Sequence, residues 1–413
     1  MVNEKEARSY CKRQRSKAGV KLMTILKRAF AITLILAITL SLTGCWNRRE
    51  LNTLGIIGLV GVDTGNNGIK STFEIIKPEK TSKGGGDKAQ APVTYMQASG
   101  STLIESFRNV PVRFERKLFV SHAKGFLFSE EVARKGLAEN LDMLLRDHEL
   151  RLTMHLIIVK DSTASDAMSI TGGINTIPSS YIEDLAKQYK VHSTSVDTKV
   201  LDFLKSYYSK GINPLVTVLK KVKKDKVGKS GQEEYELSVE GSAVFLKDRL
   251  VGFLDGPETR GYNWIVGKVS SGVVTFPTPN SNGLTSVEIF QAGSKRDVEV
   301  NDNDIKIKVK INMNGMLDEQ TTTIKLTDPT VIEILEQANS QAIKQEVEHT
   351  LQKVQKEYKS DVFGFGQIVH RKYPQQWKNM QDNWDELFSQ ASIEVETEAK
   401  ITKTGKSTLP AKE

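Results

Sequence analysis

The chain has 413 residues, with 58 Lys or Arg against 50 Asp or Glu and two cysteines. Nine of the basic residues and two of the acidic ones lie in residues 1–44, so residues 45–413 carry a net charge of only +1. The basicity therefore does not indicate a nucleic-acid partner. Two cysteines, Cys11 and Cys45, are too few for a disulfide framework, so the chain must be stable through its hydrophobic cores. From its length we expect two or three domains.

The stretch from Lys27 to Cys45, KRAFAITLILAITLSLTGC, has the order of a secretory signal: basic pair, apolar run, small residues. The apolar run, Ala29 to Leu42, has 14 residues. As a helix it would extend about 21 Å, whereas bilayer hydrocarbon is about 30 Å thick. We therefore interpret residues 1–44 as a cleaved signal rather than a membrane span; the alternative is a buried helix that ends in Gly-Cys. Translation from Met23 would give a leader of 22 residues, which is within the usual length.

Leu42-Thr43-Gly44-Cys45 resembles the lipobox of bacterial lipoproteins. The resemblance implies cleavage between Gly44 and Cys45. Cys45 would then be the first residue of the mature chain, modified as an S-diacylglycerol and N-palmitoyl cysteine. Such a chain is held at the outer face of the cell membrane, because two or more acyl chains give stable attachment.

In the first half of the mature chain, short apolar runs alternate with helical patterns. Ser129, followed by two glutamates, is expected to cap a helix with Leu137 and Leu141 on its apolar stripe. The alternation indicates a mixed sheet covered by helices. The expected strands are Ile56–Asp63, Thr72–Ile76, Tyr95–Ser99, Leu118–Phe128, Arg151–Val159 and Leu215–Val222, and the expected helices are Ser101–Asn109, one from Ser129, one from Asp161 or Ser162, Ser179–Tyr189 and Asp197–Tyr208.

Three polar residues in this half, Glu105, His122 and Arg146, invite comparison with a catalytic set. No nucleophile stands at a known spacing from them, so we interpret them as side chains that tie the sheet to its helices. Asp147-His148-Glu149 lacks the second histidine of a His-Glu-x-x-His zinc helix. We therefore expect no catalytic residue, no cofactor, no metal and no enzymatic activity.

The residues after the expected lipid anchor form the most specific motif. Cys45-Trp46-Asn47-Arg48-Arg49-Glu50-Leu51 resembles the start of the GerC-type spore germination lipoproteins, where Cys-Trp, a polar residue and Arg-Arg-Glu-Leu are usual. The segment Glu105–Asn109, the strand with Arg116 and His122, and the helix end Leu144–Asp147 resemble the same family.

A basic run, Lys220–Gly231, reads KKVKKDKVGKSG. Basic residues are attracted to anionic lipid headgroups, but this run lacks apolar anchors, so we interpret it as a solvated hairpin tip or a linker. We place a domain boundary here, with an N-terminal region at 45–225, the linker or hairpin tip at 226–235 and a C-terminal region at 236–413.

The second half contains a strongly alternating strand, Asp304–Asn312, with isoleucines and a valine on one face and lysines on the other. This pattern is typical of an antiparallel sheet with one buried face. Asp328-Pro329 opens a helix that is expected to reach Tyr358. The other expected elements are a hairpin of Leu237–Lys247 and Leu250–Leu254, a strand at Thr321–Leu326, a turn at Phe363–Gly366, a helix from Pro374 and a last strand at Ala391–Thr404.

Two pairs of residues in this half suggest ligand contacts. Glu258 and Arg260 would suit a charged ligand, but we favour a helix cap and a structural ion pair. Trp377 and Trp384 would suit an apolar or aromatic ligand, but we favour packing in the core.

The hairpin, the turn Glu258-Thr259-Arg260-Gly261, the Phe-Gly-Phe-Gly turn and the two tryptophans resemble the C-terminal part of the GerC family. The resemblance implies a non-catalytic subunit of a nutrient germinant receptor in the inner membrane of bacterial spores. In that family the lipoprotein acts with two integral-membrane subunits, an A-type and a B-type, and membrane lipid would be reached through acylated Cys45.

A rival interpretation is a solute-binding lipoprotein that feeds a transporter. It would share the anchor but show two α/β lobes with parallel sheets. A secreted hydrolase is a third interpretation. For the fold we predict an α+β protein of two or three domains, each a mixed or antiparallel β-sheet with helices packed on one face.

Overall fold

The computed structural model describes residues 4–41, 53–66, 68–77, 92–172, 174–225, 234–301 and 304–407. The chain divides into two compact units, Met1–Leu54 and Gly55–Glu413.

The first unit contains the helix α1 (Glu4–Ser41). Its segment Val20–Thr39 is long and apolar enough to cross a membrane, a property that secretory signals share. This segment is longer than the apolar run of 14 residues on which the prediction of a cleaved signal rests. Three threonines of this segment donate their hydroxyls to carbonyls four residues earlier; the Thr24 hydroxyl lies 2.7 Å from the carbonyl oxygen of Val20. Because these hydroxyls have partners within the helix, the segment suits an apolar environment.

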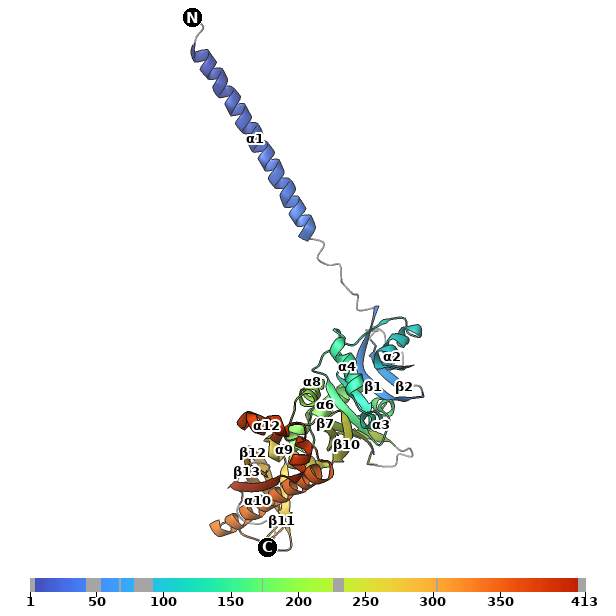
Figure 1. The fold of residues 1–413 in the computed structure, drawn as a ribbon, viewed down its shortest axis with the longest axis vertical. Coiled ribbons are helices and arrows are strands. Elements are labelled where there is room, and N and C mark those ends of the chain that lie inside the picture. The colour runs from blue at the N-terminus through green and yellow to red at the C-terminus, as the bar shows by residue number, and fades with distance from the viewer. Residues whose placement is uncertain are drawn as a thin grey trace. The chain divides into compact units, whose positions relative to one another are not determined.

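The described residues of the second unit form two sheets (Figure 1). The larger sheet has ten strands among these residues. Four central strands are parallel neighbours in the order β1 (Leu54–Gly65), β5 (Gly125–Ser129), β6 (His155–Lys160) and β7 (Leu215–Lys223). The antiparallel strands β2 (Gly68–Ile76) and β3 (Val93–Gly100) extend the sheet beyond β1, and β9 (Ser242–Leu246) and β10 (Arg249–Leu254) extend it beyond β7. The short strands β4 (Lys117–Phe119) and β8 (Tyr235–Ser238) pair with β1 and β7.

The described start of the basic run forms the end of β7, which pairs with β8, and Lys223 is opposite Tyr235. Residues 226–233 lie outside the described residues. The sheet then continues with β9 and β10, so it takes strands from both regions that we separated at 226–235. That boundary stays a prediction.

Helices cover both faces of the larger sheet, whereas we expected one. On one face lie α2 (Leu103–Asn109), α3 (Glu130–Lys135), α4 (Ala138–Arg146) and α8 (Val200–Tyr208), over a core that includes Val60, Phe126 and Ile158. On the other lie α5 (Ala164–Met168) and α6 (Pro178–Lys187), over Leu59, Leu127 and Ile157. The short helices η2 (Val110–Val112) and α7 (Tyr189–His192) follow α2 and α6. Both faces of the parallel strands are buried, which explains their continuous apolar sequences.

Two expectations for this half are wrong in detail. The strand expected at Leu118–Phe128 is two strands, β4 and β5, separated by a turn. The helix from Ser129 ends at Lys135, because Gly136 adopts φ 121°, and α4 starts anew. The hydroxyl of Ser129 makes no capping bond. Asp248 accepts from the N–H of Ala138 at 3.2 Å and so caps α4 from the β9–β10 turn.

The smaller sheet has the strand order β11 (Val273–Pro277), β12 (Leu284–Asn301), β13 (Asp304–Gln320), β14 (Ser392–Lys403). β13 and β14 are parallel and the other pairs antiparallel, so both sheets are mixed and the predicted α+β class is confirmed. β11 and β12 were missed, because two register shifts interrupt the alternation of β12. The strand expected at Thr321–Leu326 is wrong: the N–H and hydroxyl of Thr321 bond to Leu284 and end the sheet there.

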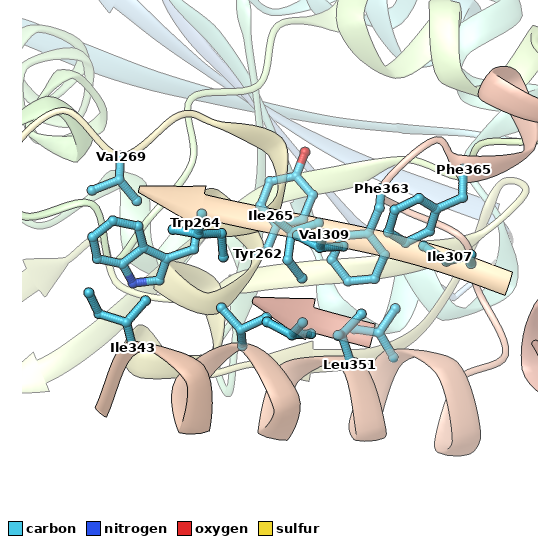
Figure 2. Packing of buried hydrophobic residues seen from close by; sticks show 14 of the residues in the cluster. Tyr262, Trp264, Ile265, Val269, Ile307, Val309, Ile343, Leu351, Phe363 and Phe365 are labelled. Carbon is cyan, nitrogen blue, oxygen red and sulfur yellow. The ribbon is translucent and has the colours of Figure 1, made fainter. Parts of the chain in front are cut away.

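Helices cover one face of the smaller sheet, as predicted (Figure 2). They are α9 (Gly256–Val266), α10 (Pro329–Gln352), α11 (Phe365–Lys372), α12 (Pro374–Met380) and α13 (Trp384–Gln390), with a π-helical turn, η3 (Lys353–Glu357), after α10. Ile305, Ile307 and Val309 of β13 face this core, and the lysines between them face outward. The single helix expected from Pro374 is thus two helices. Below, the first lobe is the larger sheet with its helices (residues 55–254) and the second lobe is residues 256–407.

Candidate functional site

Gly44 and Cys45, the residues predicted for cleavage and lipidation, lie outside the described residues. Both assignments stay predictions.

The three residues considered as a catalytic set bind local partners. Glu105 accepts a hydrogen bond at 2.7 Å from a backbone N–H four residues earlier, at the start of α2. Arg146 donates to Asp142 at 2.7 Å, and the ring of His122 packs against Phe119 with centroids 5.4 Å apart. None of these three contacts joins the sheet to a helix, so the predicted role of these residues as ties between sheet and helices stays a prediction.

Asp147-His148-Glu149 forms a turn after α4. The N–H of Glu149 donates to the carboxylate of Asp147 at 2.8 Å, and the carboxylate of Glu149 pairs with Lys117 at 2.9 Å. Within the described parts of the chain, no group of three His, Cys, Asp or Glu residues is placed to hold a metal ion.

Glu258 and Asp255 form a capping box at the start of α9, each accepting the other's N–H at 2.8 Å. Glu258 is 4% exposed and accepts from the ammonium of Lys353 at 2.7 Å. Burial alone would raise the pKa of Glu258, but the Lys353 ammonium and the Asp255 N–H hold that pKa below its usual value. The interpretation as a cap and a structural ion pair describes this geometry.

Arg260 joins three elements of the second lobe. Its guanidinium makes two parallel bonds to the carboxylate of Glu346 in α10, one of them 3.0 Å long, and donates to the carbonyl of Val273 in β11 at 2.7 Å. The indole of Trp264 also donates to Glu346, at 3.2 Å. Because Arg260 belongs to α9 and Glu346 to α10, these bonds hold the two helices together.

Trp377 and Trp384 lie in the core, as we expected, with ring centroids 5.4 Å apart. The indole N–H of Trp384 donates to Asp361 at 2.9 Å. This carboxylate is fully buried and also accepts three backbone N–H groups of the turn 363–366, at 2.8 to 3.0 Å. Burial raises the pKa of Asp361 to about 6, although the four donors oppose the shift.

Asp361 also belongs to the contact between the lobes, where residues 210–213 of the first lobe meet 361–367 and 382–385 of the second. We call this contact the clasp. The N–H of Asn213 donates to the carbonyl of Asp361 at 2.7 Å, and its side-chain amide donates to Asp385 at 2.9 Å. Lys210 pairs with Asp382 at 2.9 Å.

Two glycines let the backbones of the clasp touch. Gly211 adopts φ +78°, and a Cβ there would lie 2.7 Å from the carbonyl carbon of Gly366. A Cβ on Gly366 would lie 2.5 Å from the Cα of Gly211. The N–H of Gln367 donates to the carbonyl of Gly211 at 3.2 Å. The lobes are thus joined backbone to backbone, at a distance that side chains would prevent.

A cleft of about 460 Å³ lies beside the clasp, with walls from both lobes. Its volume is within the range of small-molecule sites. The cleft is lined by Val196, Asp197, Thr198, Asp202, Phe203, Lys205, Ser206, Ser209, Ile212, Asn213, Pro214, Leu215, Tyr262, Lys268, Val362 and Gln367. One wall carries the Asp197 carboxylate, 2.8 Å from a ring nitrogen of His155 and 3.2 Å from the Lys199 ammonium. Burial would raise the pKa of Asp197, but these two partners hold it below its usual value. The cleft can accept a small polar molecule.

Sequence reasoning did not predict the clasp. An aspartate two residues before a Gly-rich turn is a signal for side-chain bonds to the turn backbone. The bonds from the turn to Asp361 could therefore have been predicted. Asn213 and Asp385 are 172 residues apart, and no local pattern joins them.

Two domain families of spore germination proteins match the chain. The N-terminal domain of spore germination proteins matches residues 47–221, and the domain described as spore germination B3/GerAC like, C-terminal, matches residues 240–405. Similar proteins include spore germination protein KC of Bacillus subtilis strain 168, 27% identical over 94% of this chain and 98% of that protein. YndF of the same strain is 28% identical over 91% and 96%, and GerQC of Bacillus cereus is 22% identical over 90% and 98%.

The crystal structure of the GerBC protein has the same fold, with a TM-score of 0.52 and 19% identity over 83% of this chain and 96% of that one. Together, the matches of the two domain families define the chain as a spore germination protein. The chain belongs to the Ger(x)C, or GerAC-like, family, as the residues after Cys45 led us to predict.

Proposed function

We propose that this chain is a lipid-anchored, non-catalytic subunit of a nutrient germinant receptor, required for receptor assembly and for the germination response. It acts at the inner membrane of the spore with two integral-membrane subunits, an A-type and a B-type. The match of both lobes to spore germination families, along one continuous chain, carries this proposal. The apolar segment of α1 and the lipobox-like residues before Cys45 support attachment to a membrane.

The clasp suggests how the subunit works in this proposal. Asn213, Gly211 and Asp361 join the lobes, and residues 55–413 form one compact unit. A subunit of this kind is a scaffold that holds its partners near the membrane. The residues first considered for catalysis take part in structural contacts instead, which favours a scaffold over an enzyme.

The experiment compares four strains: three carry the native chain, Cys45→Ala or Cys11→Ala, and the fourth lacks the chain. We expect labelled palmitate in the native and Cys11→Ala chains, but not in Cys45→Ala. Crosslinking in spore membranes should recover the A-type and B-type subunits with the native chain, and spores that lack the chain should not respond to one class of nutrient. Palmitate in the Cys45→Ala chain would contradict the anchor, and normal germination of the deletion strain with every nutrient would contradict the receptor role.

A second candidate function, binding of a small solute, is favoured by the cleft beside the clasp. The solute-binding lipoproteins we considered have two α/β lobes, whereas here only the first lobe has a parallel centre. Calorimetry of the full-length chain with amino acids and sugars separates the two functions. Tight binding that is lost when Lys205 and Lys268 are replaced with Ala would favour the solute-binding function.

A further inference from the structure

The segment between α2 and β4 presents an exposed apolar residue among arginines. Val112 is 81% exposed, and Arg108 and Arg113 on either side of it are exposed as well. Arg116 has the opposing carboxylate of Glu115 4.0 Å away. We call residues 108–116 the basic tip.

Phe114 fixes the basic tip against the start of the first lobe. A Cβ on Gly55 would lie 2.6 Å from the ring of Phe114, so the ring packs directly on the backbone at the beginning of β1. The tip leads into β4, which pairs with β1. The tip is therefore held where the chain from Cys45 enters the lobe.

The length of that chain limits how far the tip can lie from the anchor. Gly55 is the tenth residue after Cys45, and ten extended residues span at most about 36 Å. A lobe anchored through Cys45 therefore keeps the basic tip near the lipid surface, whatever path the intervening residues take.

We propose that the basic tip binds the surface of an anionic bilayer. Val112 enters the headgroup region, and the guanidinium groups of Arg108 and Arg113 pair with lipid phosphates. Arginine suits this role because its planar donors match phosphate oxygens. Arg116 contributes less, because Glu115 offsets its charge. The inference rests on the proposed anchor at Cys45, and it gives the first lobe a fixed orientation on the membrane.

The test uses the full-length chain in vesicles of phosphatidylcholine, alone or mixed with phosphatidylglycerol. An environment-sensitive dye is attached at Val112→Cys in a Cys11→Ser background, and quenching by brominated lipid is measured. The control dye is placed at Ile174→Cys, which is 100% exposed in the connection between α5 and α6, on the opposite face of the larger sheet. A matched chain carries Arg108→Glu and Arg113→Glu.

We expect strong quenching at position 112 that needs phosphatidylglycerol, several-fold weaker quenching at position 174, and loss of quenching in the double arginine variant. Equal quenching at both positions, no dependence on phosphatidylglycerol, or quenching that needs added receptor subunits would overturn the proposal. The same labelled chains with Cys45→Ser are examined by flotation. Release from vesicles of phosphatidylcholine alone, to which the tip is not expected to bind, reports on the anchor, so failure of the anchor is distinguished from failure of the tip.

Discussion

The indole N–H of Trp384 donates to the carboxylate of Asp361 at 2.9 Å, in the core of the second lobe. Asp361 also accepts the backbone N–H groups of the Phe-Gly-Phe-Gly turn, and its own carbonyl accepts from Asn213 of the first lobe. The carboxylate of Asp361 therefore fixes a turn and a helix, and its backbone carbonyl takes part in the contact between the lobes.

Replacing Trp384 with Phe should lower the free energy of unfolding by about 2–3 kcal/mol, because a buried carboxylate loses a donor. Unfolding by urea, followed by circular dichroism of the full-length chain in mild detergent, measures the change. Trp377→Phe is the matched control: it also trims a buried indole, but its N–H donates to no described residue. Equal losses in the two variants would show that ring volume, not the bond to Asp361, matters.

The stability of the native chain should depend on the charge of Asp361. Its pKa is raised from 3.8 to about 6, so the folded state binds more protons than the unfolded state between these values. Its contribution to stability is therefore greatest below pH 4 and falls by about 3 kcal/mol as the pH rises to 6. The difference in urea midpoint between the native chain and Asp361→Asn, measured from pH 4 to 7, should fall and then level off. A difference that grows with pH would show that the four donors outweigh burial.

Replacing Gly211 with Ala should destabilise the chain by about 1–2 kcal/mol for the left-handed backbone, plus a further loss because the Cβ meets the backbone of Gly366. Gly267→Ala separates the two effects. Gly267 has φ +71°, but its Cβ would meet nothing closer than 3.6 Å. If both variants unfold at the same urea concentration, close contact of the lobes at Gly211 does not contribute to stability.

The part of the fold that the sequence predicts is the part that local patterns determine. The alternation of β13 and the Asp-Pro start of α10 lie within the elements themselves. Both elements begin where expected, although β13 continues to Gln320 and α10 ends at Gln352. β12 was missed because its register shifts break the alternation, and the break between α3 and α4 was missed because Asp248, far along the chain, caps α4.

The candidate sites divide in the same way. Glu258 was interpreted as a cap because acidic side chains are favoured near the start of a helix, and its partner in the structure, Asp255, is only three residues away. Its ion pair with Lys353 joins residues 95 positions apart, and the clasp depends on still longer separations. Contacts of this length follow from how the lobes pack, so no local pattern in the sequence predicts them.

Replacing Glu258 with Gln should lower the free energy of unfolding by about 2–3 kcal/mol at pH 7, because the ammonium of Lys353 would keep a largely buried position without its carboxylate partner. The pKa of Glu258 is held below 4.5, so its contribution is present above that pH and is lost as the pH falls through the lowered value. The gap between the urea midpoints of the native chain and Glu258→Gln should therefore narrow in acid, opposite to the trend for Asp361. Glu396→Gln, which removes an exposed pair with Lys310, is the control and should change little. If the gap between the two urea midpoints does not change with pH, the ion pair does not account for the loss of stability.

Asn213 offers the sharpest test of the clasp, since its side chain bonds in both directions. Its amide donates to Asp385 at 2.9 Å, and its oxygen accepts the N–H of Lys247 at 2.8 Å. Asn213→Ala leaves Asp385 without this donor, at a site where burial already raises the pKa of the carboxyl. We therefore expect the free energy of unfolding to fall by about 2–3 kcal/mol.

Asn213→Asp keeps the shape but sets a second carboxyl against Asp385. Two carboxylates at this distance repel, so Asn213→Asp should lose more stability than Asn213→Ala at pH 7 and recover as the pH falls to 4 and one carboxyl takes up a proton. Urea unfolding of both variants at the two pH values measures this recovery. If Asn213→Asp is as stable as the native chain at pH 7, the bond from Asn213 to Asp385 does not hold the lobes together.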